Sequence, residues 1–180
     1  MFTRARRRPH PGLAAILGLL VVVVATACGG GAGPSASGPG GAGAGDPAPR
    51  LAGTTLDGTR FDLSSLRGRP VIVNYWASWC VPCRDEFPLF KQALADHAAD
   101  GLAMVGAVYL DSDEAARSFA QKSGATWPSL TDPDGSLAKA WRVVAPPQTY
   151  FIDRNGVIVS RQIGQVSPAD FQRQLDAILK

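Results

Sequence analysis

Residues 74–88 read NYWASWCVPCRDEFP, and two of the chain's three cysteines, Cys80 and Cys83, lie in the middle of this stretch. The run VIVNYW over 71–76 predicts a buried strand, because it is rich in β-branched and aromatic residues. A helix is expected to follow over 81–99, which places Cys80 at its N-terminus. Unpaired amide N–H groups and the positive end of the helix dipole favour a thiolate over a thiol there.

The spacing of Cys80 and Cys83 lets their sulfurs bond across one helical turn. Cys80, at the first position, should be exposed and nucleophilic, whereas Cys83, one turn inside, should be shielded and should resolve a mixed disulfide. Pro82 lies between them without penalty, because the first N–H groups of a helix have no helical partner. The pattern predicts a catalytic dithiol.

Two other roles remain open for this pair on the residues alone. A zinc site needs four ligands, but the only other cysteine is Cys28 and the only histidine after it is His97, so no metal is expected. A structural disulfide is possible in an oxidising compartment, although so short a loop constrains the unfolded chain little. With no second histidine in this region, a Cys–His hydrolase is excluded.

Positive charge is concentrated at the N-terminus. The chain has 18 basic and 15 acidic residues, but four arginines precede residue 28 and every acidic residue follows it. The remainder therefore holds 14 basic and 15 acidic residues, a net charge of −1. No basic stripe is left to bind nucleic acid, and no nucleic-acid partner is expected.

Residues 1–27 have the layout of a secretory signal peptide. Arginines precede an apolar run over 13–25, which is shorter than the ~20 residues that a membrane-spanning helix needs. The segment ATAC over 25–28 resembles a bacterial lipobox, which implies a lipid on Cys28. An uncleaved signal anchor is the alternative.

Residues 28–49 predict a flexible tether between that anchor and a folded domain over 50–180. Nine of the chain's 20 glycines fall in this segment, and it has no large apolar side chain to offset the entropy of ordering. The expected location is the outer face of the cytoplasmic membrane.

The folded part alternates strands with helices and then ends in a hairpin and a helix. This order predicts the α/β class, with a three-layer α/β/α domain around a mixed sheet. Besides the elements already given, hairpins are expected over 51–63 and 149–161, strands over 102–110 and 127–130, and helices over 113–122, 137–141 and 168–179.

Residues 74–88, LSSLRGRPV over 63–71 and FIDRNG over 151–156 resemble segments of the TlpA/ResA-like thiol-disulfide oxidoreductases of the thioredoxin superfamily. The resemblance covers about residues 50–175. It implies a thioredoxin-like fold with an N-terminal β-hairpin and a helix-strand insertion at about 111–131.

The resemblance also implies a cis-proline opposite the two cysteines, and the spacing selects Pro147. Family members hold a substrate chain as an added strand on the backbone before that proline. Pro146 occupies this place here, and its missing N–H removes one donor from the pairing. Trp79 is expected to shield the sulfurs and offer a docking surface. The predicted substrate-binding residues are Trp79, Pro82, Pro146 and Pro147.

Asn74 stands where thioredoxins proper carry a buried aspartate that shuttles the proton of the resolving cysteine. Asparagine cannot titrate, so another group must do that work. Glu86 follows Cys83 by one turn on the same helix face and matches a glutamate that ResA-like proteins place beside the active site. Partial burial should raise its pKa and make it a usable proton donor or acceptor. A glutamate that merely complements the helix dipole is the alternative.

The function expected is that of a lipid-anchored, extracytoplasmic thiol-disulfide oxidoreductase, monomeric and without a cofactor. The resemblance implies a reductase of exported proteins, with apocytochrome c as one possible client, supplied with electrons by a membrane thiol-transfer protein. An oxidant or isomerase in the folding of secreted proteins is the alternative. A peroxidase would need a Thr-x-x-Cys setting, which Cys80 lacks, and a non-catalytic binding module would not need the thiol pair.

Overall fold

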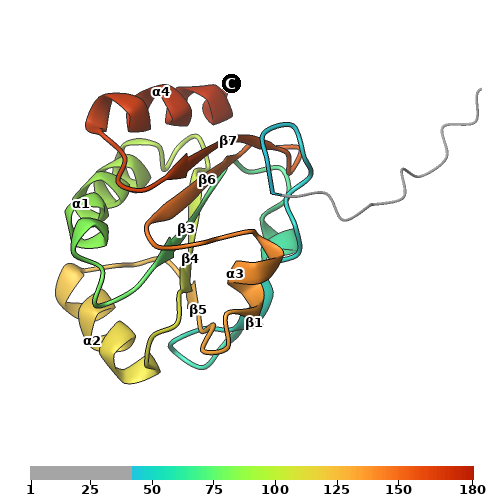
Figure 1. The fold of residues 1–180 in the computed structure, drawn as a ribbon. Helices are drawn as coiled ribbons and strands as arrows, with labels where there is room; N and C mark the ends of the chain where they lie inside the picture. Colours follow the sequence, from blue (N-terminus) through green and yellow to red (C-terminus); the bar gives the residue numbers. More distant parts are fainter. Residues whose placement is uncertain (1–41) are drawn as a thin grey trace, which may run out of the picture. The chain divides into compact units, whose positions relative to one another are not determined.

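The computed structural model describes residues 42–180 (Figure 1). The signal peptide expected over 1–27, the lipid site at Cys28 and the tether up to residue 41 lie outside this range. In the described part of the chain, no helix is both long enough and apolar enough to span a membrane.

Five strands form a mixed sheet in the order β5-β4-β3-β6-β7. The central strand β3 (Val71–Trp76) pairs in parallel with β4 (Ala103–Val108) and antiparallel with β6 (Gln148–Ile152). The short β5 (Ser129–Leu130) and β7 (Ile158–Ile163) lie at the two edges. Every residue of β3, β4 and β6 is buried, because helices and loops cover both faces of the sheet.

Three helices cover one face of the sheet: α1 (Val81–Asp96), α2 (Asp113–Ser123) and α4 (Pro168–Leu179). The short helix α3 (Ser136–Ala140) and the 3₁₀ turn Leu63–Leu66 pack on the other face. Alternating side chains of β3 contribute to the two cores. The predicted three-layer α/β/α architecture is confirmed.

Two accessory segments extend this framework. An antiparallel hairpin joins β1 (Ala52–Thr54) to β2 (Arg60–Asp62). The second segment is α2 followed by β5, which the family resemblance implies as an insertion at about 111–131. Thr55 bridges to Leu130, so the hairpin meets the insertion at the β5 edge of the sheet.

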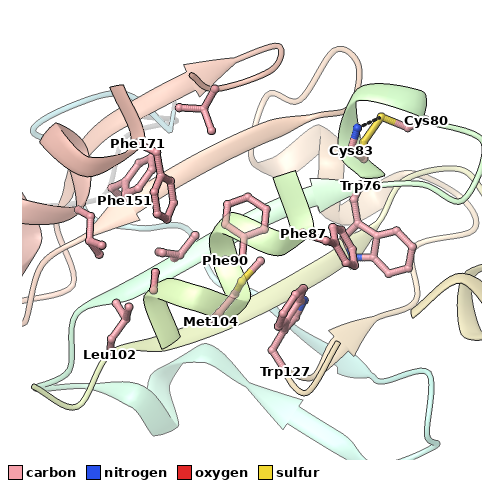
Figure 2. Packing of buried hydrophobic residues seen from close by; sticks show 14 of the residues in the cluster. Trp76, Cys80, Cys83, Phe87, Phe90, Leu102, Met104, Trp127, Phe151 and Phe171 are labelled. Atoms are coloured by element: carbon pink, nitrogen blue, oxygen red, sulfur yellow. Dashed lines mark hydrogen bonds between the residues drawn. A yellow bond between two sulfur atoms is a disulfide. The ribbon is translucent and has the colours of Figure 1, made fainter. Parts of the chain in front are cut away.

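Aromatic side chains hold α1 on the sheet (Figure 2). The ring of Phe87 lies 5.3 Å from Trp76, 4.9 Å from Phe119 and 5.1 Å from Trp127, measured between centroids. Such pairs add about 0.5–1.5 kcal/mol each beyond the area they bury. Phe87 therefore joins the helix that begins with the cysteines to β3, α2 and the loop before β5.

Residues 42–49, the last part of the expected tether, are paired with the hairpin between β6 and β7. The N–H of Gly45 donates to Ile158 at 2.8 Å, and the N–H of Ile158 donates to Asp46 at 2.9 Å. Ala42 is fully buried. Backbone hydrogen bonds to an edge strand thus replace the missing apolar side chains, and the ordered domain includes residues 42–49 instead of starting at 50.

Candidate active site

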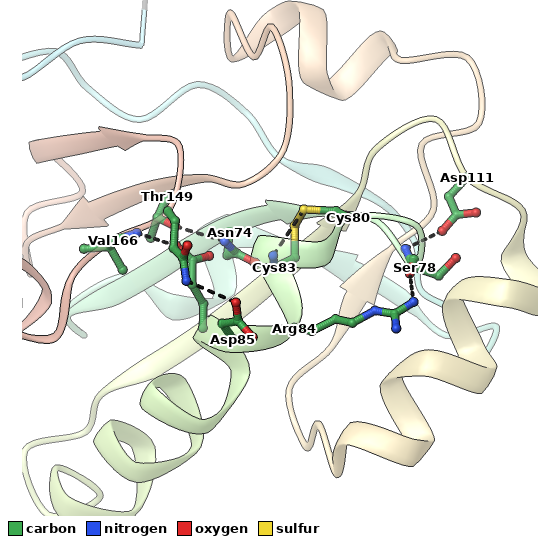
Figure 3. The surroundings of a disulfide bond; sticks show 11 residues. Asn74, Ser78, Cys80, Cys83, Arg84, Asp85, Asp111, Thr149 and Val166 are labelled. Carbon is green, nitrogen blue, oxygen red and sulfur yellow. Dashed lines mark hydrogen bonds between the residues drawn. A yellow bond between two sulfur atoms is a disulfide. The ribbon is translucent and has the colours of Figure 1, made fainter.

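Cys80 and Cys83 form a disulfide at the start of α1 (Figure 3). Cys80 is the N-cap of the helix, and its Sγ accepts a hydrogen bond from the N–H of Cys83 at 3.2 Å. Pro82 lies in the first turn, where its missing N–H leaves no helical bond unmade. In the dithiol form, the same N–H and the helix dipole would stabilise a thiolate at Cys80.

The disulfide is buried. Cys83 is 0% exposed, as expected for a resolving cysteine, but Cys80 is only 3% exposed. The expectation of an exposed Cys80 is therefore wrong for the disulfide form, because this residue packs into the aromatic core on the α1 side of the sheet. Its two neighbours in the sequence, Trp79 and Val81, are exposed, at 54% and 67%.

Two side chains hold the loop before Cys80 at the backbone of Ser78 (Figure 3). The N–H of Ser78 donates to Asp111 Oδ2 at 2.6 Å, and Arg84 donates to the carbonyl oxygen of Ser78 at 2.9 Å. The other carboxylate oxygen of Asp111 accepts from the N–H of Ser112 at 2.8 Å. Asp111 thus ties the beginning of α2 to the loop that carries the cysteine.

Sequence patterns did not assign Asp111 or Arg84 to the site. The one signal available was position, because Asp111 follows a buried strand parallel to β3 and such strands end at the same edge of a sheet. Leu110, directly before it, has φ +45°, which is sparsely populated for a residue other than glycine. Backbone strain of this kind is concentrated at functional sites.

The peptide bond between Pro146 and Pro147 is cis. Pro147 directly precedes β6, whose residue Gln148 pairs with Tyr75 near the end of β3. The proline loop and the Cys80 loop therefore leave the same end of the sheet. Pro147 is buried and Pro146 half-buried.

Large exposed apolar side chains gather at this end of the sheet. Leu110 follows β4, Val144 precedes the cis-proline, and Ile163 ends β7 opposite Gln148. Together with Trp79 and Val81, these residues form a surface that we call the apolar rim. The rim residues are also the large apolar residues that are exposed in the part of the chain that the structure describes. The apolar rim comprises Trp79, Val81, Leu110, Val144 and Ile163.

Glu86 is fully buried one turn beyond Cys83 on the inner face of α1. Its Oε1 accepts a hydrogen bond from the N–H of Val166 at 2.7 Å, whereas its Oε2 has no hydrogen-bond partner. Burial raises the pKa of Glu86 to about 7, the bond from Val166 opposes the rise, and the nearby charge of Asp85 adds to it. The expected direction of the pKa shift is confirmed, so the carboxyl group can exchange a proton near neutral pH.

Asn74 is buried on β3, opposite Thr149 of β6. Its Nδ2 donates to the hydroxyl of Thr149 at 2.9 Å. Its Oδ1 is buried without a hydrogen-bond partner. The side chain lies next to Cys83 in Figure 3.

No group of three or more metal-ligating side chains comes together within residues 42–180. His97 is paired with Asp100 at 2.8 Å after the end of α1. A cleft of about 390 Å³ lies at the opposite end of the sheet from the disulfide, where it is lined by Val71 and Ile152.

Known proteins resemble this chain in sequence and in fold. The chain matches the AhpC/TSA family over residues 44–161. It is 33% identical over 132 residues to the thioredoxin-like protein YneN of Bacillus subtilis (strain 168), a match that covers 72% of this chain and 76% of YneN. It is 29% identical over 131 residues to the thiol-disulfide oxidoreductase ResA of Geobacillus kaustophilus (strain HTA426), which covers 73% of this chain and 75% of ResA.

Among solved structures, a protein from Chlorobium tepidum described as a thiol:disulfide interchange protein DsbE is similar, with a TM-score of 0.71. The two are 30% identical, and the match covers 76% of this chain and 98% of that one. Three observations agree on disulfide exchange. They are the disulfide at a helix N-terminus, the cis-proline at the same end of the sheet and these similarities to known proteins. The chain belongs to the AhpC/TSA family and is a thiol-disulfide oxidoreductase of the ResA type, with a thioredoxin-like fold and a Cys80–Cys83 pair.

Proposed function

We propose that the protein is held on the outer face of the cytoplasmic membrane by a lipid on Cys28 and there reduces disulfides of exported proteins. The main support for this reaction is the disulfide between an N-cap cysteine and a fully buried cysteine. This arrangement gives the two sulfurs different roles. Cys80 attacks, because the helix N-terminus stabilises its thiolate, and Cys83 resolves, because a client cannot reach it.

The reaction proceeds by two thiol-disulfide exchanges. The Cys80 thiolate attacks one sulfur of a client disulfide, which forms a mixed disulfide and releases the second client sulfur as a thiolate. Cys83 loses its proton and attacks Cys80, which releases the first client sulfur and forms the enzyme disulfide. The client gains two electrons and two protons, and a membrane dithiol then reduces the enzyme disulfide and is itself oxidised.

Glu86 takes the proton of Cys83 in this scheme and returns it when the enzyme is reduced again. Its buried carboxyl group follows Cys83 on the inner face of α1, and its pKa is raised by burial to about 7. A proton acceptor works best when its pKa is close to the working pH. Asn74 cannot do this, because an amide does not titrate in this range.

The apolar rim suits an unfolded or extended client chain with apolar side chains beside its cysteine. Trp79 and Val81 flank Cys80 in the sequence, and both are largely exposed. Pro146 and Pro147 would receive the client backbone, and Pro82 lies between the two cysteines. Because Pro146 lacks an N–H, it offers the client only a carbonyl oxygen. The client must therefore supply the donor at that point.

The reduction potential tests the direction of electron flow. A value near that of thioredoxin, about −270 mV, is expected for a reductase, and a value near that of DsbA, about −120 mV, would show an oxidant of protein folding instead. Clients can be identified with Cys83→Ser, which stalls the mixed disulfide on Cys80. Cys80→Ser/Cys83→Ser is the matched control, because it forms no mixed disulfide.

The lipid anchor has its own test. Radiolabelled palmitate should enter the full chain and should be absent from a Cys28→Ala variant. Label that persists in Cys28→Ala would disprove a lipid on Cys28. Apocytochrome c is tested as a client by whether its disulfide is captured by Cys83→Ser.

A further inference from the structure

The buried amide oxygen of Asn74 lacks a hydrogen-bond donor in the disulfide form. Asn74 is fully buried, and its Nδ2 is used by Thr149, but its Oδ1 has no partner. An unpaired acceptor away from water costs free energy, and such exceptions in folded proteins usually have a reason. The question is which group could donate to this oxygen in another state of the protein.

Cys83 is the neighbour whose hydrogen-bonding capacity changes with the redox state. Ile72 and Trp76 of β3 share a buried cluster with Cys83, and position 74 points to the same face of the sheet. Figure 3 shows the Asn74 side chain between Thr149 and Cys83. In the disulfide, the sulfur of Cys83 carries no hydrogen. In the dithiol, the same sulfur carries an S–H group, which is a weak donor.

We propose that Asn74 Oδ1 accepts a hydrogen bond from the Cys83 thiol when the pair is reduced, and that this bond sets part of the reduction potential. A dithiol donor breaks the Cys80–Cys83 bond, supplies two electrons and two protons, and becomes a disulfide. Cys83 keeps one proton as S–H, and this proton meets the unpaired oxygen. Asn74 is then a positioning residue that favours the reduced form over the disulfide.

Glu86 is the competing donor. Its Oε2 is also buried without a partner, and a protonated carboxyl group could donate to Asn74 instead of the thiol. A bond from Glu86 would not require reduction of the cysteines. The two possibilities differ in one observable, because only a bond from Cys83 changes the vibration of its S–H group.

The test is infrared spectroscopy of the S–H stretching band in the full chain. Cys80→Ser leaves Cys83 as a permanent thiol, and subtraction of the Cys80→Ser/Cys83→Ser spectrum removes every other thiol. The Cys83 band should lie at the frequency of a hydrogen-bonded thiol, below that of a thiol in an apolar solvent. A band at the apolar-solvent position overturns the proposal, whether or not any Asn74 variant folds.

Substitution of Asn74 gives the second test. Adding Asn74→Leu or Asn74→Ala to Cys80→Ser should move the band to higher frequency, whereas the matched control Thr149→Val keeps the acceptor and should leave the band in place. An unmoved band in a folded Asn74 variant shows that the Cys83 thiol does not donate to Asn74, and it refutes the proposal.

The potential provides an independent measurement on chains that keep both cysteines. The equilibrium constant for reduction by dithiothreitol should fall roughly five- to tenfold in Asn74→Leu, which is the effect of one lost hydrogen bond. A tenfold fall corresponds to a potential lower by about 30 mV. An unchanged or higher constant contradicts the proposal. Neither result bears on whether the wild-type protein exchanges disulfides, so the proposed function is tested separately.

Discussion

The carboxyl group of Glu86 is the titratable group most altered by folding near the disulfide. Its pKa rises from 4.5 to about 7, mainly because it is buried. Between these values the folded state binds more protons than the unfolded state, so stability falls as the pH rises through this window and levels off above it. The shift corresponds to a loss on the order of 2–4 kcal/mol.

Glu86→Gln should therefore be more stable than the wild type at pH 8 and close to it at pH 4. Denaturant unfolding of the oxidised protein across this range measures the difference. Glu114→Gln is the matched control, because it makes the same substitution at an exposed carboxylate on α2. A wild-type stability that does not fall between pH 4 and 8 would contradict this assignment of the pKa.

The same substitution tests the proton transfer. The rate of exchange with a protein disulfide should show an inflection near pH 7 in the wild type, and Glu86→Gln should lose it, because the amide cannot accept the proton of Cys83. Stopped-flow fluorescence measures the profile. If the two profiles coincide, Glu86 plays only a structural or dipole-compensating part.

Asp111 should matter for rate through the position of Cys80. Removing its carboxylate in Asp111→Ala frees the N–H of Ser78 and loosens the loop, so exchange with a protein disulfide should slow roughly tenfold or more. Asp111→Asn retains an acceptor oxygen and should recover most of the rate. Asp113→Ala is the control, because this exposed acid lies in the first turn of α2. Equal rates in Asp111→Ala and the wild type would exclude a positioning role.

Individual residues were predictable to different degrees, for a physical reason. The two cysteines, Pro147 and the pKa of Glu86 follow from short-range patterns or from the family resemblance. Asp111 contacts Ser78 across 33 positions of sequence, and this contact exists only because β3 and β4 end side by side. The burial of Cys80 likewise depends on packing between distant segments.

At the level of elements, β4 contains a position that only glycine fits. A Cβ on Gly106 would lie 2.3 Å from the hydroxyl oxygen of Ser129 and 2.6 Å from Nε1 of Trp76. Gly106→Ala should therefore destabilise the protein by about 1–3 kcal/mol through overpacking. Gly53→Ala is the control, because its Cβ would meet only the end of the Leu130 side chain at 3.3 Å. Urea unfolding compares the two, and equal stabilities would contradict the close packing at Gly106.

Element boundaries were predicted well where periodicity and capping agreed. Strand β3 and helix α4 have the predicted bounds, and Ser167 caps α4 by accepting from the N–H of Asp170 at 3.1 Å. Helix α1 ends at Asp96, before the predicted residue 99, because the chain turns after His97. Strand β5 is only two residues long. Pro128, directly before it, has no N–H to donate to the ladder, although its carbonyl oxygen accepts from the N–H of Gly106 at 2.8 Å.

At the level of the whole molecule, residues 42–49 belong to the domain although their composition is that of a linker. Ala42 is buried beside the sheet, whereas Ala44 is exposed. Ala42→Leu would overpack a fully buried position and should lower the unfolding free energy by about 1–3 kcal/mol, but Ala44→Leu should change it by less than about 0.5 kcal/mol. Thermal unfolding of both variants measures this contrast. Equal stabilities would mean that the segment is a free tether.

The burial of Cys80 also limits which thiols can react with the disulfide. A disulfide whose attacked sulfur belongs to a residue only 3% exposed is poorly accessible to small thiols in solution. We therefore expect faster attack by a protein that contacts the apolar rim beside Cys80 than by a small thiol. The protein would then exchange electrons only with proteins that bind its surface beside Cys80. Proteins that reduce disulfides and proteins that form them could then work in one compartment without exchanging electrons through this protein.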